Sequence, residues 1–267
     1  MPPRSIFSIF GRKPPLEQLR DSSVHATSNC KLYDHPEFQV RVSNSAVPAE
    51  DVSWLLRFLE QRVAQGEKFR SGESLQVGWM LTMLEDGPAG FLRILEPDMK
   101  VVPLKFVDSV DRTLMHLRNQ KDVVQSLSSP TEPDFPSLRQ SVVVHVNHKT
   151  ASRILLTRNG AADEADAGWW LSDLDDQAGL QDPARFLKTS LYQLGINRPD
   201  LVKFFALPAG LRVVVDGARI GVLGVDGEVQ QIPGSYLSEL NKLRQQRATS
   251  TAQSSESCGL LPAIKRR

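Results

Sequence analysis

The sequence predicts an α+β fold made of two domains of antiparallel sheet, each with helices packed on one face. Three observations favour this class. The pattern before residue 128 runs strand, helix, two strands, helix; a segment with three prolines follows at 129–138; and Asp-Gly pairs at 216–217 and 226–227 separate apolar runs. Because Asp-Gly suits the backbone angles of tight hairpin turns, we expect antiparallel pairing rather than a wound parallel sheet.

In the N-terminal half, the spacing of apolar residues distinguishes strands from helices. Alternation with a period of two predicts a half-buried strand, and recurrence at three and four residues predicts an amphipathic helix. A turn signal at Asp86-Gly87-Pro88 joins two of the strands into a hairpin. The expected elements are a strand at 38–42, a helix at 52–63, strands at 77–83 and 91–95, and a helix at 110–127.

The C-terminal half begins with runs rich in strand formers and ends in a meander. Its two Asp-Gly turns pair three strands in sequence, and a final amphipathic helix completes the domain. The expected elements are strands at 141–146, 153–157 and 168–172, short helices at 190–194 and 199–206, strands at 211–215, 219–225 and 228–232, and a helix through 236–243.

Two changes in composition set the domain boundaries. Several prolines without a hydrophobic periodicity disfavour both a helix and a central strand, which indicates a linker. A polar, low-complexity run has too little apolar surface to offset the entropy of ordering, which indicates a disordered tail. We therefore expect a disordered or flexible tail at 1–30, an N-terminal α+β domain at 31–128, a Pro-rich linker at 129–138, a C-terminal α+β domain at 139–247, and a disordered tail at 248–267.

Composition excludes several classes of protein. The 267 residues include 32 Lys and Arg against 31 Asp and Glu, so no bulk charge attracts nucleic acid or anionic lipid. The two cysteines, Cys30 and Cys258, form neither a disulfide framework nor a zinc motif, which favours a reducing, cytoplasmic location. No apolar run is long enough to predict a membrane span.

The segment between Asn159 and Ala184 contains seven carboxylates and no Lys or Arg, beside the tandem Trp169-Trp170. Negative potential next to aromatic surface favours a basic partner, because opposed potentials steer encounter and buried aromatic residues anchor it. We expect the partner-binding residues to be Asp163, Glu164, Asp166, Trp170, Asp173, Asp175 and Asp176.

Strand alternation assigns the tryptophans to different environments. It places Trp169 in the core and Trp170 outward, which makes Trp170 the best candidate for a binding hot spot. The same alternation places Trp79 in the core. Trp54 and Phe58, four residues apart on the first helix, either widen its buried face or form a second exposed patch, and we favour the core.

Catalytic and metal-binding motifs are absent from the sequence. There is no Gly-x-Ser-x-Gly, and residues three apart on a strand, such as His145 and His148, face opposite sides. The acidic segment lacks the alternating ligands of an EF-hand. Two other interpretations of it stay open: a solvated loop that confers solubility, and paired carboxylates for hydrolysis. We expect no catalytic residue, cofactor or metal.

Residues 141–236 resemble the bacterial immunity protein 33 family. The resemblance rests on the acidic loop before Gly168-Trp169, the acidic run Asp173–Asp176, and the turn Leu207-Pro208-Ala209-Gly210. The N-terminal half, with Gly78-Trp79-Met80-Leu81, resembles the immunity protein 33-like variant that carries both halves. The chain departs from the family pattern at Ser172-Asp173, where Gly-Asp is frequent.

The resemblance implies neutralisation of a bacterial toxin, and it supplies no catalytic residue. Together with the acidic segment, it predicts a cytoplasmic immunity protein that binds a cognate toxin with a basic active site, with no nucleic acid as partner and no membrane span. The alternatives are a non-enzymatic adaptor or scaffold of a secretion system and, less favoured, a carboxylate-dependent hydrolase.

Overall fold

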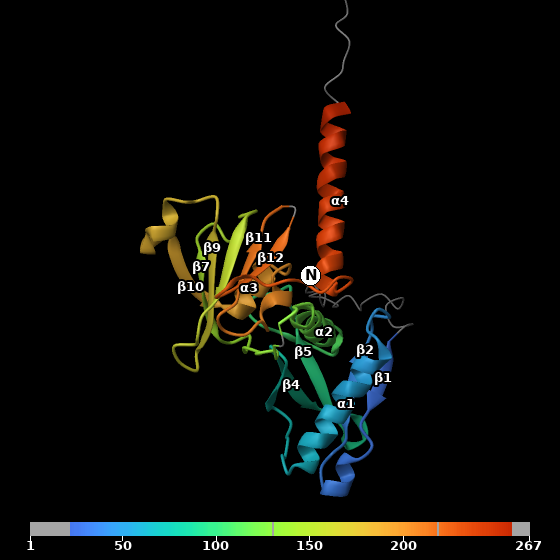
Figure 1. Ribbon diagram of the computed structural model, residues 1–267. Coiled ribbons are helices and arrows are strands. Elements are labelled where there is room, and N and C mark those ends of the chain that lie inside the picture. Colours follow the sequence, from blue (N-terminus) through green and yellow to red (C-terminus); the bar gives the residue numbers. More distant parts are fainter. Residues whose placement is uncertain (1–21, 130, 218, 258–267) are drawn as a thin grey trace, which may run out of the picture.

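The computed structural model describes residues 22–257, apart from 130 and 218, and contains two sheets with helix α2 (Asp111–Gln125) between them (Figure 1). Residues 1–21 and 258–267 of the two expected tails lie outside the described residues. Helices pack on one face of each sheet, so the predicted α+β class is confirmed.

The N-terminal sheet has the strand order β1-β2-β5-β4-β3, with β6 paired to β5. Helix α1 (Ala49–Ala64) and the first half of α2 bury Leu55, Leu59 and Leu114 against it. The strands are β1 (Ser23–Ala26), β2 (Phe38–Val42), β3 (Ser74–Val77), β4 (Met80–Asp86), β5 (Leu92–Pro97) and β6 (Phe106–Val107), with short 3-10 turns η2 (Cys30–Tyr33) and η3 (Pro88–Gly90).

The C-terminal sheet has the strand order β10-β7-β9-β8-β11-β12-β13. Its strands are β7 (Ser141–His145), β8 (Ile154–Arg158), β9 (Asp166–Asp173), β10 (Phe186–Ser190), β11 (Arg212–Val215), β12 (Ile220–Gly224) and β13 (Gly227–Glu228). The helical elements are η4 (Gly179–Gln181), η5 (Pro183–Arg185), α3 (Leu191–Asn197), η6 (Val202–Phe204) and α4 (Tyr236–Ser257). Residues from α2, α3, η6 and α4 bury one face of this sheet.

Both sheets are mixed, so the prediction of purely antiparallel sheets is wrong at two strand pairs. Strands β2 and β5 are parallel, because α1 and the β3–β4 hairpin lie between them in the chain and provide a crossover. Strands β7 and β9 are also parallel, because β9 inserts between β7 and β8 instead of adding to the edge. Hairpin signals describe only neighbouring strands and carry no information about such insertions.

The strand expected at 77–83 is broken by a turn. Gly78 has a φ of +60° and, with Trp79, joins β3 to β4. Trp79 is fully buried as predicted, but it reaches the core from a turn rather than from a strand face. Its ring packs edge-on against Phe205, with the ring centroids 5.4 Å apart, so it belongs to the core of the C-terminal sheet.

Two segments expected to be disordered are ordered where the structure describes them. Residues 23–26 form β1, which pairs with β2 along its whole length. Helix α4 continues through 248–257, although these residues have a polar, low-complexity sequence. The first turn of α4 is fixed by the buried Leu237, and extending a nucleated helix costs much less than starting one.

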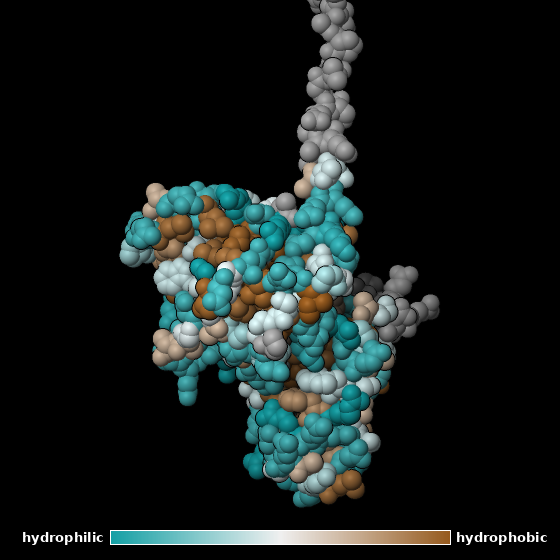
Figure 2. Space-filling model, in the orientation of Figure 1, coloured by the Kyte–Doolittle hydropathy of each residue, from teal (hydrophilic) through white to brown (hydrophobic). Residues whose placement is uncertain are grey.

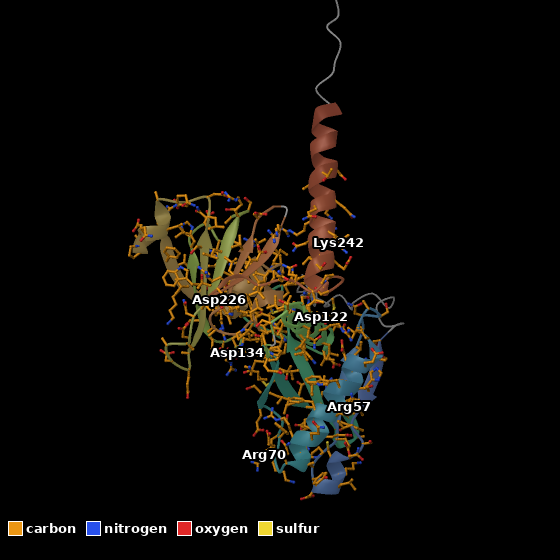
Figure 3. All side chains as sticks on the ribbon, viewed as in Figure 1. Arg57, Arg70, Asp122, Asp134, Asp226 and Lys242 are labelled. Atoms are coloured by element: carbon orange, nitrogen blue, oxygen red, sulfur yellow. The ribbon has the colours of Figure 1, made fainter. Side chains whose placement is uncertain are left out.

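Helix α2 contributes to both hydrophobic cores. Val110 and Leu114 pack in the N-terminal core, whereas Val123 and Val124 pack in the C-terminal core. Figure 3 labels Asp122 of this helix in the region where the two sheets meet. We keep the division into two domains as a proposal, with α2 as the element that joins them.

His116 on α2 is half-buried, and this partial burial predicts a loss of stability in weak acid. Its ring packs edge-on against Trp79, with centroids 5.8 Å apart, and burial, assisted by Arg112, lowers its pKa to about 4 from 6.5. Between these two values the unfolded chain binds the proton and the folded protein does not. The contribution of His116 to the free energy of unfolding is therefore fully present above pH 6.5. It is lost as the pH falls towards 4, and the loss from this group is at most about 3 kcal/mol.

Urea unfolding at pH 7, 5.5 and 4.5 measures this effect. The variant His116→Gln should lose less stability over this range than the wild type, while a residual decline persists because burial also lowers the pKa of His148. Equal pH dependence in the two proteins would contradict the assignment.

Candidate interaction surface

The predicted binding residues lie on strand β9 and in the turns at its two ends, so the structure divides them. The strand has eight residues, from Asp166 to Asp173. At about 3.3 Å per residue its ends lie about 23 Å apart. Asp163, Glu164 and Asp166 therefore form one acidic turn, and the remaining carboxylates form another at the far end. The seven-residue cluster expected from the sequence is not a single patch.

The first acidic turn, residues 163–166, is stabilised by hydrogen bonds between its carboxylates and nearby backbone amides. The Asp163 carboxylate accepts a hydrogen bond from the Ala165 amide at 2.8 Å, and Asp166 accepts from the amides of Ala162 and Gly168 at 3.1 and 3.0 Å. Asp163 and Glu164 are exposed, whereas Asp166 is half-buried. This turn leaves two carboxylates available to a partner.

The second acidic turn, residues 173–176, is largely neutralised within the protein. Asp173 is only 5% exposed and accepts a hydrogen bond from the side-chain Nδ2 of Asn147 at 3.0 Å. Asp175 pairs with Arg153 Nη1 at 3.0 Å. Asp176 accepts from Arg185 Nε at 3.0 Å, and this interaction is the main reason that the pKa of Asp176 is lowered. These carboxylates therefore stabilise the turn, and little of their negative charge is available to a partner.

The histidine pair beside this turn is structural. Strand β7 ends at His145, so the chain bends and both rings are buried instead of facing opposite sides of a strand. His145 Nε2 lies 3.2 Å from the Asp176 carboxylate, and His148 Nδ1 lies 2.9 Å from the His145 carbonyl oxygen. In the described part of the chain, no three His, Cys, Asp or Glu side chains are grouped to hold a metal ion.

The two tryptophans of β9 face opposite sides of the sheet, as alternation predicts. Trp169 is 1% exposed, and its Nε1 donates a hydrogen bond to the Phe205 carbonyl at 3.2 Å. Trp170 is 38% exposed, and its ring centroid lies 4.9 Å from that of Phe186 on β10. Trp170 is therefore the large aromatic residue available on the outer face.

The outer face of the C-terminal sheet is only partly covered. Along β7, β8, β11 and β12, residues that point inward are buried, and the apolar residues between them that point outward are half-buried. The outward apolar residues are Val143, Leu155, Val214 and Leu223. Figure 2 shows hydrophobic residues gathered over the strands of this sheet. This face, with Trp170 on its middle strand, is called the open face below.

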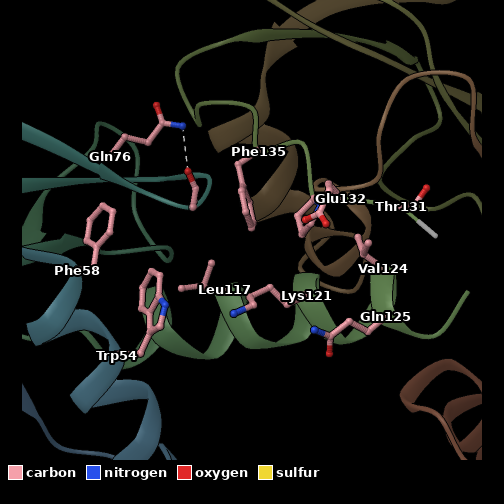
Figure 4. A pocket seen from close by; sticks show the side chains of 12 residues that line it. Trp54, Phe58, Gln76, Leu117, Lys121, Val124, Gln125, Thr131, Glu132 and Phe135 are labelled. Atoms are coloured by element: carbon pink, nitrogen blue, oxygen red, sulfur yellow. Dashed lines mark hydrogen bonds between the residues drawn. The ribbon is translucent and has the colours of Figure 1, made fainter. Parts of the chain in front are cut away.

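A groove lies between α1, α2 and residues 131–135 (Figure 4). Trp54 and Phe58 stack with centroids 5.3 Å apart, and Lys121 Nζ lies 5.5 Å from the Trp54 ring centre. The groove has a volume of about 700 Å³. Both aromatic residues are half-buried and pack partly on the N-terminal core. They therefore widen the buried face of α1 and also form part of an exposed patch, the two roles considered from the sequence.

These features define an α+β protein with a partly uncovered sheet face that carries an exposed tryptophan, the kind of surface through which proteins bind other proteins. Residues 119–223 match the family model of the Imm33-like domain, so the predicted immunity protein 33-like assignment is confirmed for this part of the chain. The match runs from α2 to β12 and includes Trp170. Searches of curated proteins and of solved structures found no match. None of the described helices is long and apolar enough to cross a membrane.

Proposed function

We propose that this protein is an immunity protein that binds a cognate bacterial toxin and blocks the toxin's active site or substrate path. The observation that carries the proposal is the match of residues 119–223 to the Imm33-like domain, in a chain whose C-terminal sheet leaves one face partly uncovered. A cytoplasmic location belongs to the same proposal, and the free, buried thiol of Cys30 is consistent with it.

The contact surface that we propose combines Trp170 with the first acidic turn. Trp170 provides rigid apolar area, which is typical of binding hot spots. Asp163 and Glu164 are exposed, and neither forms an ion pair with another described residue. Their unpaired charge favours a basic region of the toxin, such as a cleft that binds phosphate. Asp175 and Asp176 are weaker candidates because arginines already compensate them.

Co-expression with the product of the neighbouring reading frame tests this function. We expect that product to be toxic alone, to lose toxicity beside this protein, and to co-purify with it. The double variant Asp163→Asn/Glu164→Gln should associate about tenfold more slowly at low salt, with a flatter salt dependence, because steering depends on exposed charge.

The matched control neutralises two exposed carboxylates elsewhere, Glu132→Gln/Asp226→Asn, and should leave the association rate unchanged. Equal rates for the two double variants would remove the acidic turn from the proposal. A neighbouring product that is harmless and does not bind would favour the adaptor or scaffold alternative. The hydrolase alternative has less support, because Arg185 lowers the pKa of Asp176, whereas a general acid requires a raised pKa.

A further inference from the structure

The strand register places five side chains in one row across the open face. Lys188 on β10 pairs with Val143 on β7, and Val143 pairs with Trp170 on β9. Trp170 then pairs with Thr157 on β8, which pairs with Arg212 on β11. Paired residues point to the same face, and neighbouring strands lie about 4.8 Å apart. Trp170 therefore has a cation about 10 Å away on each side.

The two cations in this row are unpaired. Within residues 22–257, apart from 130 and 218, neither Lys188 nor Arg212 forms a side-chain hydrogen bond or an ion pair, and both are exposed. Three other arginines around the same sheet behave differently, since each pairs with a carboxylate of its own chain: Arg153 with Asp175, Arg185 with Asp176, and Arg219 with Glu228. The uncompensated charge around Trp170 is therefore positive.

Protection of the sheet edge does not explain both cations. Strand β10 is an edge strand, and a lysine there discourages pairing with another chain. Strand β11, however, lies between β8 and β12, so Arg212 has no edge to protect. Between the two cations lie Val143, Trp170 and Thr157, so an aromatic ring occupies the centre of the row. An aromatic centre flanked by charge is the arrangement found at protein-binding hot spots.

We infer that the open face binds a protein segment that places an apolar side chain over Trp170 and a carboxylate near each of Lys188 and Arg212. The identity of this partner as a toxin rests on the proposed function above. The partner's charge here is opposite to that expected at the first acidic turn, about 13 Å further along β9. A partner that carries both signs in this order would bind in only one orientation, because the reversed orientation brings like charges together.

A peptide selection tests the inference without requiring the toxin. Random twelve-residue peptides displayed on phage are selected on the full-length protein and counter-selected on Lys188→Glu/Arg212→Glu. We expect enriched peptides to contain an aromatic or aliphatic residue flanked by Asp or Glu. Their affinity, measured by fluorescence anisotropy, should fall at least about 100-fold on the double variant and on Trp170→Ser, and should survive Lys242→Glu on α4. Thermal unfolding of the double variant should be unchanged, because both substituted side chains are exposed.

Enrichment of basic peptides, absence of enrichment, or equal binding to the double variant would overturn the inference. The product of the neighbouring reading frame separates this result from the proposed function. If that product binds the wild type and the double variant equally well, the surface assignment fails and the proposed function stands. If it binds neither while acidic peptides are selected as expected, the proposed function fails and the surface stands.

Discussion

Replacing Trp169 with alanine is expected to destabilise the protein by about 3–5 kcal/mol, the usual cost of removing a large buried aromatic side chain. Trp169 is 1% exposed and packs against Phe205, whose carbonyl accepts its indole hydrogen bond at 3.2 Å. The guanidinium of Arg158, itself buried, lies 5.4 Å from the indole centre, so the substitution also removes a cation–π contact in the core. Urea unfolding at pH 7 measures the loss.

The adjacent residue provides a matched control. Trp170→Ala removes the same side chain from the opposite face of the same strand, where 38% of the residue is exposed, and should cost less than about 1 kcal/mol. The two variants should also separate function from stability, because only Trp170 lies on the open face. Similar losses of stability in both would mean that the two faces of β9 are buried to a similar extent.

This contrast between neighbouring tryptophans shows what sequence alone predicts well. Alternation depends on local backbone geometry, which is why it separates Trp169 from Trp170 correctly. Helix α1 was predicted for the same reason, since its buried residues Val52, Leu55, Leu59 and Val63 recur at helical spacing within the chain. The Asp-Gly turns likewise predict the β11–β12–β13 meander.

Properties that depend on distant partners were not predictable in this way. Residues 159–184 contain only negative charges, so the sequence predicted an acidic surface there. Arg153 and Arg185, which form ion pairs with Asp175 and Asp176, lie outside this range of residues. The row that contains Lys188 and Arg212 exists only because β10 and β11 join the same sheet as β9. Sequence spacing does not encode strand order, so these cations were not recognised as neighbours of Trp170.

Replacing Gly168 with alanine is expected to destabilise the protein by about 3 kcal/mol or more and to lower the melting temperature by about 10 °C. Gly168 has a φ of +70°, a conformation that costs a residue with a side chain about 1–3 kcal/mol. A Cβ atom at this position would lie 2.3 Å from the Asn159 carbonyl oxygen, which belongs to the backbone and has little freedom to move. The two penalties arise at the same residue and act together.

Gly160→Ala is the control, because the added Cβ would meet no atom within 4 Å and the backbone is not in the left-handed region. It should change stability by less than about 0.5 kcal/mol. In Gly168→Ala, relief of the clash requires movement at the start of β9, where the Asn159 amide donates to the Gly168 carbonyl at 2.8 Å. That movement would shift Trp169 and Trp170 together, so peptide binding at the open face should weaken along with stability. A melting temperature equal to that of the wild type would show that the chain at Gly168 can move without cost, and the Gly-Trp pair would then have no structural role in fixing β9.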